Sequence, residues 1–159
     1  MLFKIFYILY FLILFNDKIN ARILTECEAA NELRKSSIIS ETFIRHWVCL
    51  MKFESGLDTR FIKTNGPLAS ASYGVFQISS KNNEWCIKGR SGGKCNAKCE
   101  DFANDDISDD IICAEKIQSL VGFKYWENWM KKCKTGPLPD LNNCRNRRYS
   151  SFKYPLWFL

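Results

Sequence analysis

The sequence predicts one α+β domain, with helices before and after a small antiparallel sheet. Apolar residues recur at helical spacing in residues 43–59 and again in residues 107–133, whereas residues 61–78 carry a turn signal and a short β-branched and aromatic run. No repeat and no linker divides the chain, so it suits a single compact domain. All eight cysteines lie between residues 27 and 144, which adds a disulfide framework to the prediction.

The first 21 residues have the layout of a secretory signal. Lys4 precedes an uncharged run over residues 5–15, and a polar stretch ends at Asn20-Ala21, so we expect cleavage after Ala21. The competing interpretation is a membrane anchor, but the apolar run is too short to span a bilayer comfortably. We therefore expect an exported chain that starts at Arg22 and does not insert stably into a membrane.

The predicted first helix begins at a capping box. Thr25 is followed three residues later by Glu28, and each side chain can bond the backbone N–H of the other residue. The helix continues through Ala29, Ala30 and Leu33, and residues 36–40 form a connection.

The second predicted helix carries a carboxylate at the end of an apolar stripe. The stripe consists of Ile44, Trp47, Val48 and Met51. Glu54 is the next position on it, and Gly56 follows at the usual stop position. Burial disfavours the charged form of a carboxyl group, so we expect a raised pKa and a group able to donate a proton near neutral pH. The alternative is a helix end with its glutamate turned to solvent.

The rest of the chain predicts the sheet, a loop and two more helices. Asn65-Gly66-Pro67 indicates a turn, and residues 73–78 form a short β-branched and aromatic run, so we expect a small antiparallel sheet in this part of the chain. Residues 88–98 form a loop rich in glycine and lysine. Helical spacing returns in two sets of residues, which are Ile107, Ile111, Ala114 and Ile117, and then Trp126, Trp129, Met130 and Cys133.

The formal charge of +6 is concentrated outside the domain. The first 21 residues contribute +1 and the tail after Cys144 contributes +4, which leaves residues 22–144 near +1. This distribution argues against a nucleic-acid groove. The tail, residues 145–159, is basic and then aromatic; it could touch a membrane or bacterial surface, and the alternative is a disordered or partly docked terminus.

The eight cysteines predict four disulfides in an exported chain. Zinc is the competing interpretation. Only Cys95 and Cys99 have metal-finger spacing, and His46 is the single histidine, so zinc is disfavoured. Spacing alone leaves 105 pairings open.

Several motifs share an order and spacing that identify a family. They are Trp47-Val48-Cys49, Lys52-Phe53-Glu54-Ser55, Tyr73-Gly74-Val75-Phe76-Gln77-Ile78, Trp85-Cys86, Cys95-x3-Cys99 and Trp126-x2-Trp129-x3-Cys133. Across residues 27–144 the chain resembles the animal c-type lysozymes and the α-lactalbumins. The resemblance implies a helical lobe, a small sheet lobe and the bridges Cys27–Cys144, Cys49–Cys133, Cys86–Cys99 and Cys95–Cys113.

The resemblance also implies a cleft between the lobes that holds a β-1,4-linked amino-sugar polymer. Glu54 matches the general acid of lysozymes, a well-known carboxyl group with a raised pKa. Trp126 matches the tryptophan packed against that acid. Trp85 matches a sugar-contacting tryptophan, and Gln77 and Ser79 match positions on the cleft floor. The alternative for each aromatic residue is ordinary core packing.

One catalytic position departs from the family pattern. Lysozymes place an aspartate just before the Tyr-Gly-x-x-Gln-Ile run, and here Ser72 stands there, with no acidic residue between Asp58 and Glu84. The reaction needs a carboxylate about 5 Å from the acid, on the other face of the sugar. A neutral hydroxyl cannot replace that charge, so we expect hydrolysis to be weak.

The segment between Cys99 and Cys113 holds five acidic residues and an asparagine from Asp101 to Asp110. Such crowded carboxylates repel each other, and calcium, which prefers several oxygen ligands, would relieve the repulsion. The loop is similar to the calcium-binding elbow of α-lactalbumins. That similarity implies ligands from the side chains of Asn104, Asp109 and Asp110 and the carbonyls of Asp101 and Asp106. The alternative is an acidic helix cap without a metal.

Three functions follow from the resemblance. The first is a secreted monomeric lysozyme-like protein that binds, and weakly hydrolyses, the N-acetylmuramic acid and N-acetylglucosamine polymers of bacterial cell walls. The second is a protein that binds peptidoglycan or chitin-like oligosaccharides without turnover, and the third is a modulatory partner protein in the manner of α-lactalbumin. Hydrolysis by the first of these would require no cofactor, and a bound calcium ion would have a structural role. Retention of Glu54 favours the first two.

Overall fold

The computed structural model describes residues 22–64, 66 and 70–144. The predicted secretory signal, the tail after Cys144, and Asn65 and Pro67 of the predicted turn lie outside the described residues. Among the helices of the described part, none is long and apolar enough to cross a membrane.

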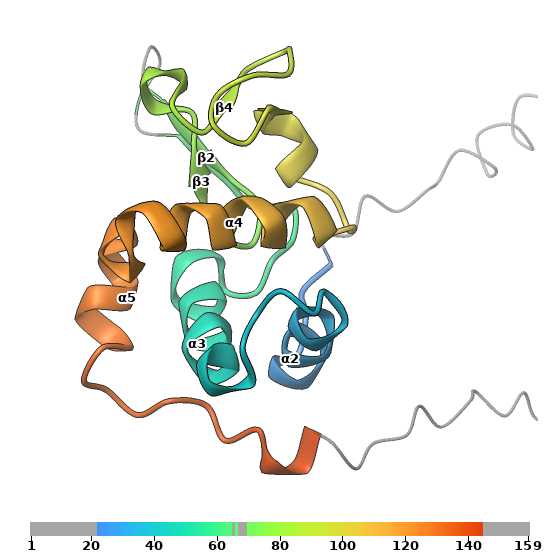
Figure 1. The fold of residues 1–159 in the computed structure, drawn as a ribbon, viewed down its shortest axis with the longest axis vertical. Helices are drawn as coiled ribbons and strands as arrows, with labels where there is room; N and C mark the ends of the chain where they lie inside the picture. Colours follow the sequence, from blue (N-terminus) through green and yellow to red (C-terminus); the bar gives the residue numbers. More distant parts are fainter. Residues whose placement is uncertain (1–21, 65, 67–69, 145–159) are drawn as a thin grey trace, which may run out of the picture.

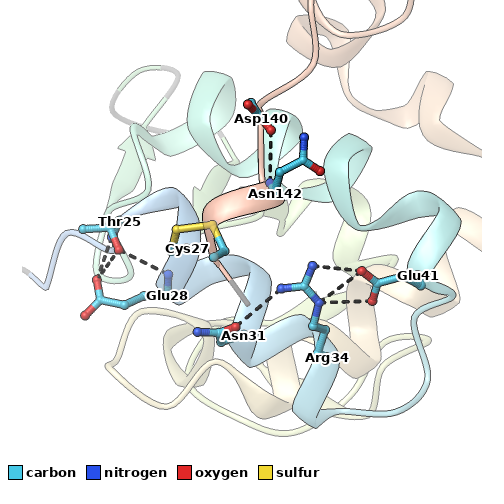
Figure 2. The surroundings of a disulfide bond; sticks show 9 residues. Thr25, Cys27, Glu28, Asn31, Arg34, Glu41, Asp140 and Asn142 are labelled. Carbon is cyan, nitrogen blue, oxygen red and sulfur yellow. Dashed lines mark hydrogen bonds and ion pairs between the residues drawn. A yellow bond between two sulfur atoms is a disulfide. The ribbon is translucent and has the colours of Figure 1, made fainter. Parts of the chain in front are cut away.

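The described part of the chain contains four α-helices (Figure 1). They are α2 (Glu26–Lys35), α3 (Ile44–Ser55), α4 (Ser108–Val121) and α5 (Glu127–Lys132). The capping box before α2 is confirmed: the Thr25 hydroxyl accepts from Glu28 N–H, and the Glu28 carboxylate accepts from Thr25 N–H at 2.8 Å (Figure 2). Short 3₁₀ turns occupy Glu41–Phe43, Lys81–Asn83, Cys99–Phe102, Phe123–Tyr125 and Asn142–Cys144.

Two small sheets complete the fold, so the α+β class is confirmed. Strands β1 (Ile62–Thr64), β2 (Ala71–Tyr73) and β3 (Ile78–Ser79) pair antiparallel in that order. The register places Ser72 opposite Lys63 on one side and opposite Ser79 on the other. Strands β4 (Cys86–Ile87) and β5 (Ala97–Lys98) form a separate parallel pair, so the segment predicted as a loop over 88–98 ends in a strand.

The small antiparallel sheet predicted for this part of the chain is confirmed, and the run over residues 73–78 spans the hairpin between two of its strands. Tyr73 ends β2 and Ile78 begins β3, and the four residues between them form the turn of a hairpin. Gly74 and Gln77 have φ values of +69° and +52°, and Gln77 N–H donates to Gly74 C=O at 3.1 Å. The β-branched and aromatic composition has another cause: Val75 and Phe76 are fully buried, so this turn contributes side chains to the core.

The core lies between the helices and under the sheet. Figure 1 shows β2, β3 and β4 toward one end of the molecule, α2, α3 and α5 toward the other, and α4 crossing between them. Helix α3 packs against α2 and α5. Two of the three predicted stripes are buried, that of α3 (Ile44, Trp47, Val48 and Met51) and that of α4 (Ile107, Ile111, Ala114 and Ile117). Of the third stripe, Trp126 and Cys133 are buried and Met130 is exposed.

Four disulfides hold the described chain together. They are Cys27–Cys144, Cys49–Cys133, Cys86–Cys99 and Cys95–Cys113, the same pairs that the resemblance implies. The first joins α2 to the end of the domain (Figure 2), and the second joins α3 to the residue after α5. These two close long loops, for which the loss of chain entropy on cross-linking is greatest.

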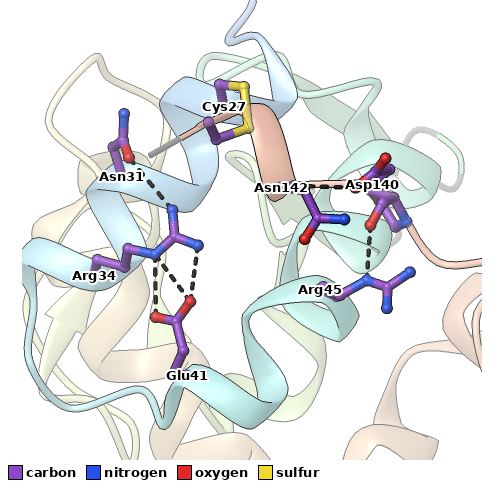
Figure 3. Close-up of polar contacts among 9 residues, drawn as sticks. Cys27, Asn31, Arg34, Glu41, Arg45, Asp140 and Asn142 are labelled. Carbon is purple, nitrogen blue, oxygen red and sulfur yellow. Dashed lines mark hydrogen bonds and ion pairs between the residues drawn. A yellow bond between two sulfur atoms is a disulfide. The ribbon is translucent and has the colours of Figure 1, made fainter. Parts of the chain in front are cut away.

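The segment leading to Cys144 is also held by an arginine of α3. Arg45 donates from Nε to the Pro139 carbonyl at 2.8 Å (Figure 3). Its guanidinium Nη2 also donates to the Leu138 carbonyl at 3.1 Å. Nearby, Arg34 of α2 pairs with Glu41 at 2.8 Å. The helical lobe is therefore fixed by polar contacts and disulfides on the side away from the sheet.

Candidate active site

A cleft of about 410 Å³ lies where the sheet meets the helices. Its walls come from the end of α3, the three strands and the segment that leads into α5. The lining residues are Glu54, Lys63, Ser72, Gln77, Ser79, Lys81, Glu84, Trp85, Tyr125, Trp126 and Glu127. The structure thus brings together all six residues that the sequence predicts for catalysis and substrate binding.

Glu54 occupies the last turn of α3 and is half-buried, as the apolar stripe predicts. Both of its oxygens accept hydrogen bonds from Asn128: Oε1 from the backbone N–H and Oε2 from the side-chain amide, each at 3.1 Å. Burial raises the pKa of the Glu54 carboxyl, while the Asn128 donors and, last, Lys63 oppose that rise. The carboxyl group of α3 therefore also caps the first turn of α5.

Trp126 and Tyr125 connect the two walls of the cleft. The Trp126 indole N–H donates to the Phe76 carbonyl at 2.7 Å, and its ring meets Trp47 edge-on with 5.5 Å between centroids. The Tyr125 hydroxyl accepts from Ser79 N–H at 3.1 Å. Burial raises the pKa of Tyr125 to about 12, so this hydroxyl stays protonated at neutral pH. These two bonds tie the helical segment to the sheet.

Gln77 and Trp85 lie in the cleft wall, but most of their surface is covered. Gln77 is 6 % exposed and donates its amide to the carbonyls of Phe61 and Gly74, so it supports the hairpin turn. Trp85 is 1 % exposed, and its ring meets Tyr125 edge-on. Each therefore offers a ligand less surface than a sugar-contacting role would require.

Ser72 faces the cleft from the middle strand. Its neighbours Ala71 and Tyr73 are buried, as expected from the alternation of side chains along a strand. Lys63 stands opposite it on β1, and the side chain of Lys63 is exposed in the same cleft. The strand that should supply a carboxylate thus has a hydroxyl group, and its partner strand has a positive charge.

Six lining or contacting residues escaped the sequence analysis: Lys63, Lys81, Glu84, Tyr125, Glu127 and Asn128. For Lys63 a usable signal existed, because alternation along a short strand paired with residues 71–73 would have placed it beside Ser72. Asn128 had no such signal, since 74 positions separate it from Glu54.

The acidic loop is closed by its own hydrogen bonds. The Asn104 amide N–H donates to the Asp101 carbonyl, its oxygen accepts from Asp106 N–H at 2.7 Å, and Asp105 turns away to pair with Arg60 at 2.6 Å. Asp109 is half-buried. No group of three or more His, Cys, Asp or Glu side chains is arranged for a metal among the described residues.

The buried carboxylate of Asp110 is the feature of this loop that would suit a bound cation. It is 0 % exposed, and neither carboxylate oxygen has a hydrogen-bond partner among the described residues. Burial, followed by the negative charge of Asp109, raises the pKa of Asp110 well above its usual value. Two adjacent carboxylates with one unpartnered in the interior suit a hard cation, provided that the Asn104 amide turns its oxygen toward it.

Comparison with known proteins decides the family. Residues 22–144 match the C-type lysozyme/alpha-lactalbumin family. The chain is 42 % identical over 125 residues to a lysozyme of Bombyx mori, covering 78 % of this chain and 88 % of that protein. The chain belongs to the C-type lysozyme/alpha-lactalbumin family.

The similar proteins include both lysozymes and alpha-lactalbumins. An alpha-lactalbumin of Capra hircus is 39 % identical over 106 residues, which cover 65 % of this chain and 72 % of that protein. The crystal structure of a calcium-binding lysozyme from equine milk superposes with a TM-score of 0.62 at 30 % identity, over 77 % of this chain and 95 % of that one. Family membership therefore fixes the fold, and turnover has to be argued from the cleft.

Proposed function

We propose that the cleft binds β-1,4-linked amino-sugar polymers, such as peptidoglycan or chitin-like oligosaccharides, and hydrolyses them weakly. The observation that carries the proposal is the half-buried Glu54 carboxyl, whose pKa is raised, at the junction of the two walls of a cleft. Extracellular cell-wall glycan is the substrate class that family membership favours.

In this proposal Glu54 donates a proton to the glycosidic oxygen. A raised pKa keeps a larger fraction of the carboxyl protonated near neutral pH, which general acid catalysis requires. The two Asn128 donors do not block this, because each carboxyl oxygen has a second lone pair that can carry the proton. Asn128 thus fixes the orientation of the group while leaving it able to react.

The opposite side of the cleft limits the rate. Positive charge develops at the anomeric carbon in the transition state, and Ser72 supplies no anion to stabilise it. Lys63 adds a positive charge on the neighbouring strand, which disfavours the same transition state. Losing one preorganised electrostatic group typically lowers the rate by about 100-fold or more. These features support the second candidate function, glycan binding without turnover.

Two other acidic residues line the cleft, and neither replaces the missing carboxylate in this proposal. Glu84 pairs with Lys94 at 2.8 Å, and Glu127 pairs with Lys131 at 2.5 Å. Glu127 also begins α5, the helix whose first turn binds Glu54, so it lies on the side of the proton donor and not on the strand of Ser72.

The test combines binding and turnover on the purified chain from Arg22. Isothermal titration with chitohexaose should show binding, and a suspension of bacterial cell walls should clear slowly in wild type and not at all in Glu54→Gln. Binding with no clearing would support the glycan-binding candidate. Rapid clearing that survives Glu54→Gln, or that is lost in Glu127→Gln instead, would show that the wrong residue has been named as the acid.

We also propose that the acidic loop binds calcium through the side chains of Asn104, Asp109 and Asp110 and the carbonyls of Asp101 and Asp106. When bound, calcium would neutralise the buried Asp110 carboxylate and stabilise the loop; it would take no part in hydrolysis. The support is the unpartnered carboxylate of Asp110. Equal melting temperatures in calcium and in chelator would contradict this site.

We also propose that the protein is exported. All eight cysteines are paired, a state that oxidising compartments maintain. We expect the secreted protein to begin at Arg22 and to run as a monomer. N-terminal sequencing of protein secreted by a eukaryotic host, together with light scattering, tests both points.

A further inference from the structure

One row of side chains crosses the sheet on the side of the cleft. Residues that face each other in an antiparallel pair point to the same face. The register therefore aligns Lys63 of β1, Ser72 of β2 and Ser79 of β3, and all three line the cleft. Lys81 follows two residues after Ser79, donates its backbone N–H to the Ser79 hydroxyl at 3.1 Å, and lines the cleft as well. The row thus has an ammonium group at each end and two hydroxyl groups between.

Neither charge of this row is held in an ion pair among the described residues, although the positive charge of Lys63 also acts on Glu54 and Glu127 across the cleft. The acidic residues of the cleft have other partners: Glu54 binds Asn128, Glu84 binds Lys94 and Glu127 binds Lys131. Lys63 and Lys81 make no ion pair among the described residues, and both side chains are exposed. An ammonium group offers three donors and a serine hydroxyl one, so the row is rich in donors on one face of a saccharide-sized cleft.

We infer that the row of Lys63, Ser72, Ser79 and Lys81 selects saccharides that carry an oxyanion substituent, a carboxylate or a sulfate, on the sugar bound against the sheet. This inference rests on the proposed function, because it names the substrate class for the same cleft. Neutral chitin-like polymer would bind through the rest of the cleft, and the oxyanion would add charge-assisted hydrogen bonds along the row.

The geometry favours an anion over the alternatives. A cation or a positively charged sugar would meet two ammonium groups without a counter-charge on this wall. A neutral sugar can use the hydroxyl groups but gains little from Lys63 and Lys81, which then stay in water. An oxyanion gains from the positive charges of Lys63 and Lys81 as well as from a hydroxyl group, and two exposed charge pairs of ordinary strength predict binding about tenfold tighter at low ionic strength.

The experiment compares three oligosaccharides that share one backbone. Isothermal titration of the secreted chain with chitohexaose, 6-O-carboxymethyl chitohexaose and 6-O-sulfated chitohexaose gives three dissociation constants, at low salt and again at high salt. We expect one or both modified oligosaccharides to bind about tenfold tighter than chitohexaose, with a preference that shrinks as salt increases. The two arms show whether the row prefers carboxylate or sulfate.

Matched variants assign the effect to the row. Lys63→Gln and Lys81→Gln should each reduce the preference, and the double variant should abolish it, while binding of chitohexaose changes less than about twofold. Lys134→Gln removes one exposed positive charge outside the cleft lining and should leave all three constants unchanged. All three lysines are exposed, so circular dichroism should show native folding in every variant.

The outcomes separate this inference from the proposed function. Equal binding of all three oligosaccharides to wild type overturns the inference and leaves the proposed function standing. A preference that persists in the double variant overturns it as well. Binding of only the modified oligosaccharides, lost in the double variant, supports the inference and contradicts a cleft for neutral amino-sugar polymer. Failure of all three to bind overturns both.

Discussion

At the scale of single residues, the pKa of the Glu54 carboxyl is determined by two opposing influences. Desolvation at the end of the α3 stripe raises the pKa of its carboxyl, and the N–H donors of Asn128 lower it. The sequence predicts the first influence, because the stripe and the stop signal at Gly56 place Glu54 at a partly buried helix end. It does not predict the second, because the start of α5 meets the end of α3 only in the folded chain.

Asn128→Ala should raise the pKa of Glu54 further. The side-chain amide bonds Oε2 and favours the charged form, so its removal leaves the protonated form relatively more stable. Titration of the labelled Glu54 carboxyl by ¹³C NMR should show a midpoint shifted to higher pH. Any hydrolysis that needs the protonated acid should then extend to higher pH by the same amount. Asn142→Ala, at an exposed position, is the control; an unmoved or lowered midpoint in Asn128→Ala would contradict this account of the site.

Ser72→Asp should increase hydrolysis of chitohexaose by about tenfold or more, because it returns an anion to the strand that faces the sugar. Lys63 stands opposite on β1 and would pair with the introduced carboxylate, so part of its charge would be screened. The combination of Ser72→Asp with Lys63→Asn should therefore exceed the single variant, and Ser72→Asp with Lys134→Asn should equal it. Chromatography of the cleaved oligosaccharides measures all three. No gain in any variant would mean that the missing carboxylate does not limit the reaction.

At the scale of elements, the helices follow from the sequence more directly than the sheet. The 3.6-residue period and the capping box are local signals; the period is confirmed in α3 and α4, and the capping box in α2. The segment 73–78 shows where local signals fail. Its β-branched and aromatic residues are buried because the hairpin turn packs into the core, and only the positive φ values of Gly74 and Gln77 reveal a turn. Burial and strand geometry favour the same residue types, so composition could not separate them.

Gly74→Ala should destabilise the protein strongly. A Cβ at this position would lie 1.8 Å from the Phe102 carbonyl oxygen and 2.5 Å from Asp110 Oδ1, in a backbone conformation with φ +69°. We expect a loss of at least about 2 kcal/mol in the free energy of unfolding, measured by urea denaturation. Gly89→Ala separates the two causes, since Gly89 has φ +73° and no neighbour within 4 Å of the added atom. Equal losses in the two variants would show that the close approach at Gly74 has no cost of its own.

At the scale of the whole molecule, the candidate site depends on contacts that no single segment specifies. Tyr125 bonds Ser79, Asn128 bonds Glu54, and the cross-strand register brings Lys63 to Ser72. The sequence supplied the residue types, and the resemblance implied the disulfide pairs among 105 possibilities. The charge on the sheet wall could not be predicted, because it depends on which side chains share one face after three short strands pair.

Asp110 connects the acidic loop to the packing between sheet and helices. Its carboxylate lies against Gly74 of the hairpin, is completely buried and lacks a hydrogen-bond partner among the described residues, while its pKa is raised well above the usual value. A buried carboxyl with a raised pKa binds its proton more tightly in the folded state than in the unfolded state. Its contribution to stability is therefore present in acid and is lost as pH rises through the folded-state pKa.

Asp110→Asn should accordingly have opposite effects with and without calcium. In chelator at pH 7 the folded state pays for a carboxyl group with a raised pKa, and the amide removes that cost. We therefore expect a gain of about 1–3 kcal/mol that disappears at pH 3, because the raised pKa costs no stability in acid. In calcium the wild type should gain stability by ligand binding, and the variant should not. Thermal melts under the four combinations of pH and calcium measure both effects.

Asp106→Asn is the control, because it keeps the backbone carbonyl and the side-chain oxygen that accepts from Ser108 N–H, and it should still respond to calcium. A calcium response in Asp110→Asn equal to that of wild type would remove this loop as the site, since the buried carboxylate that supports the proposal would then have no part in binding calcium.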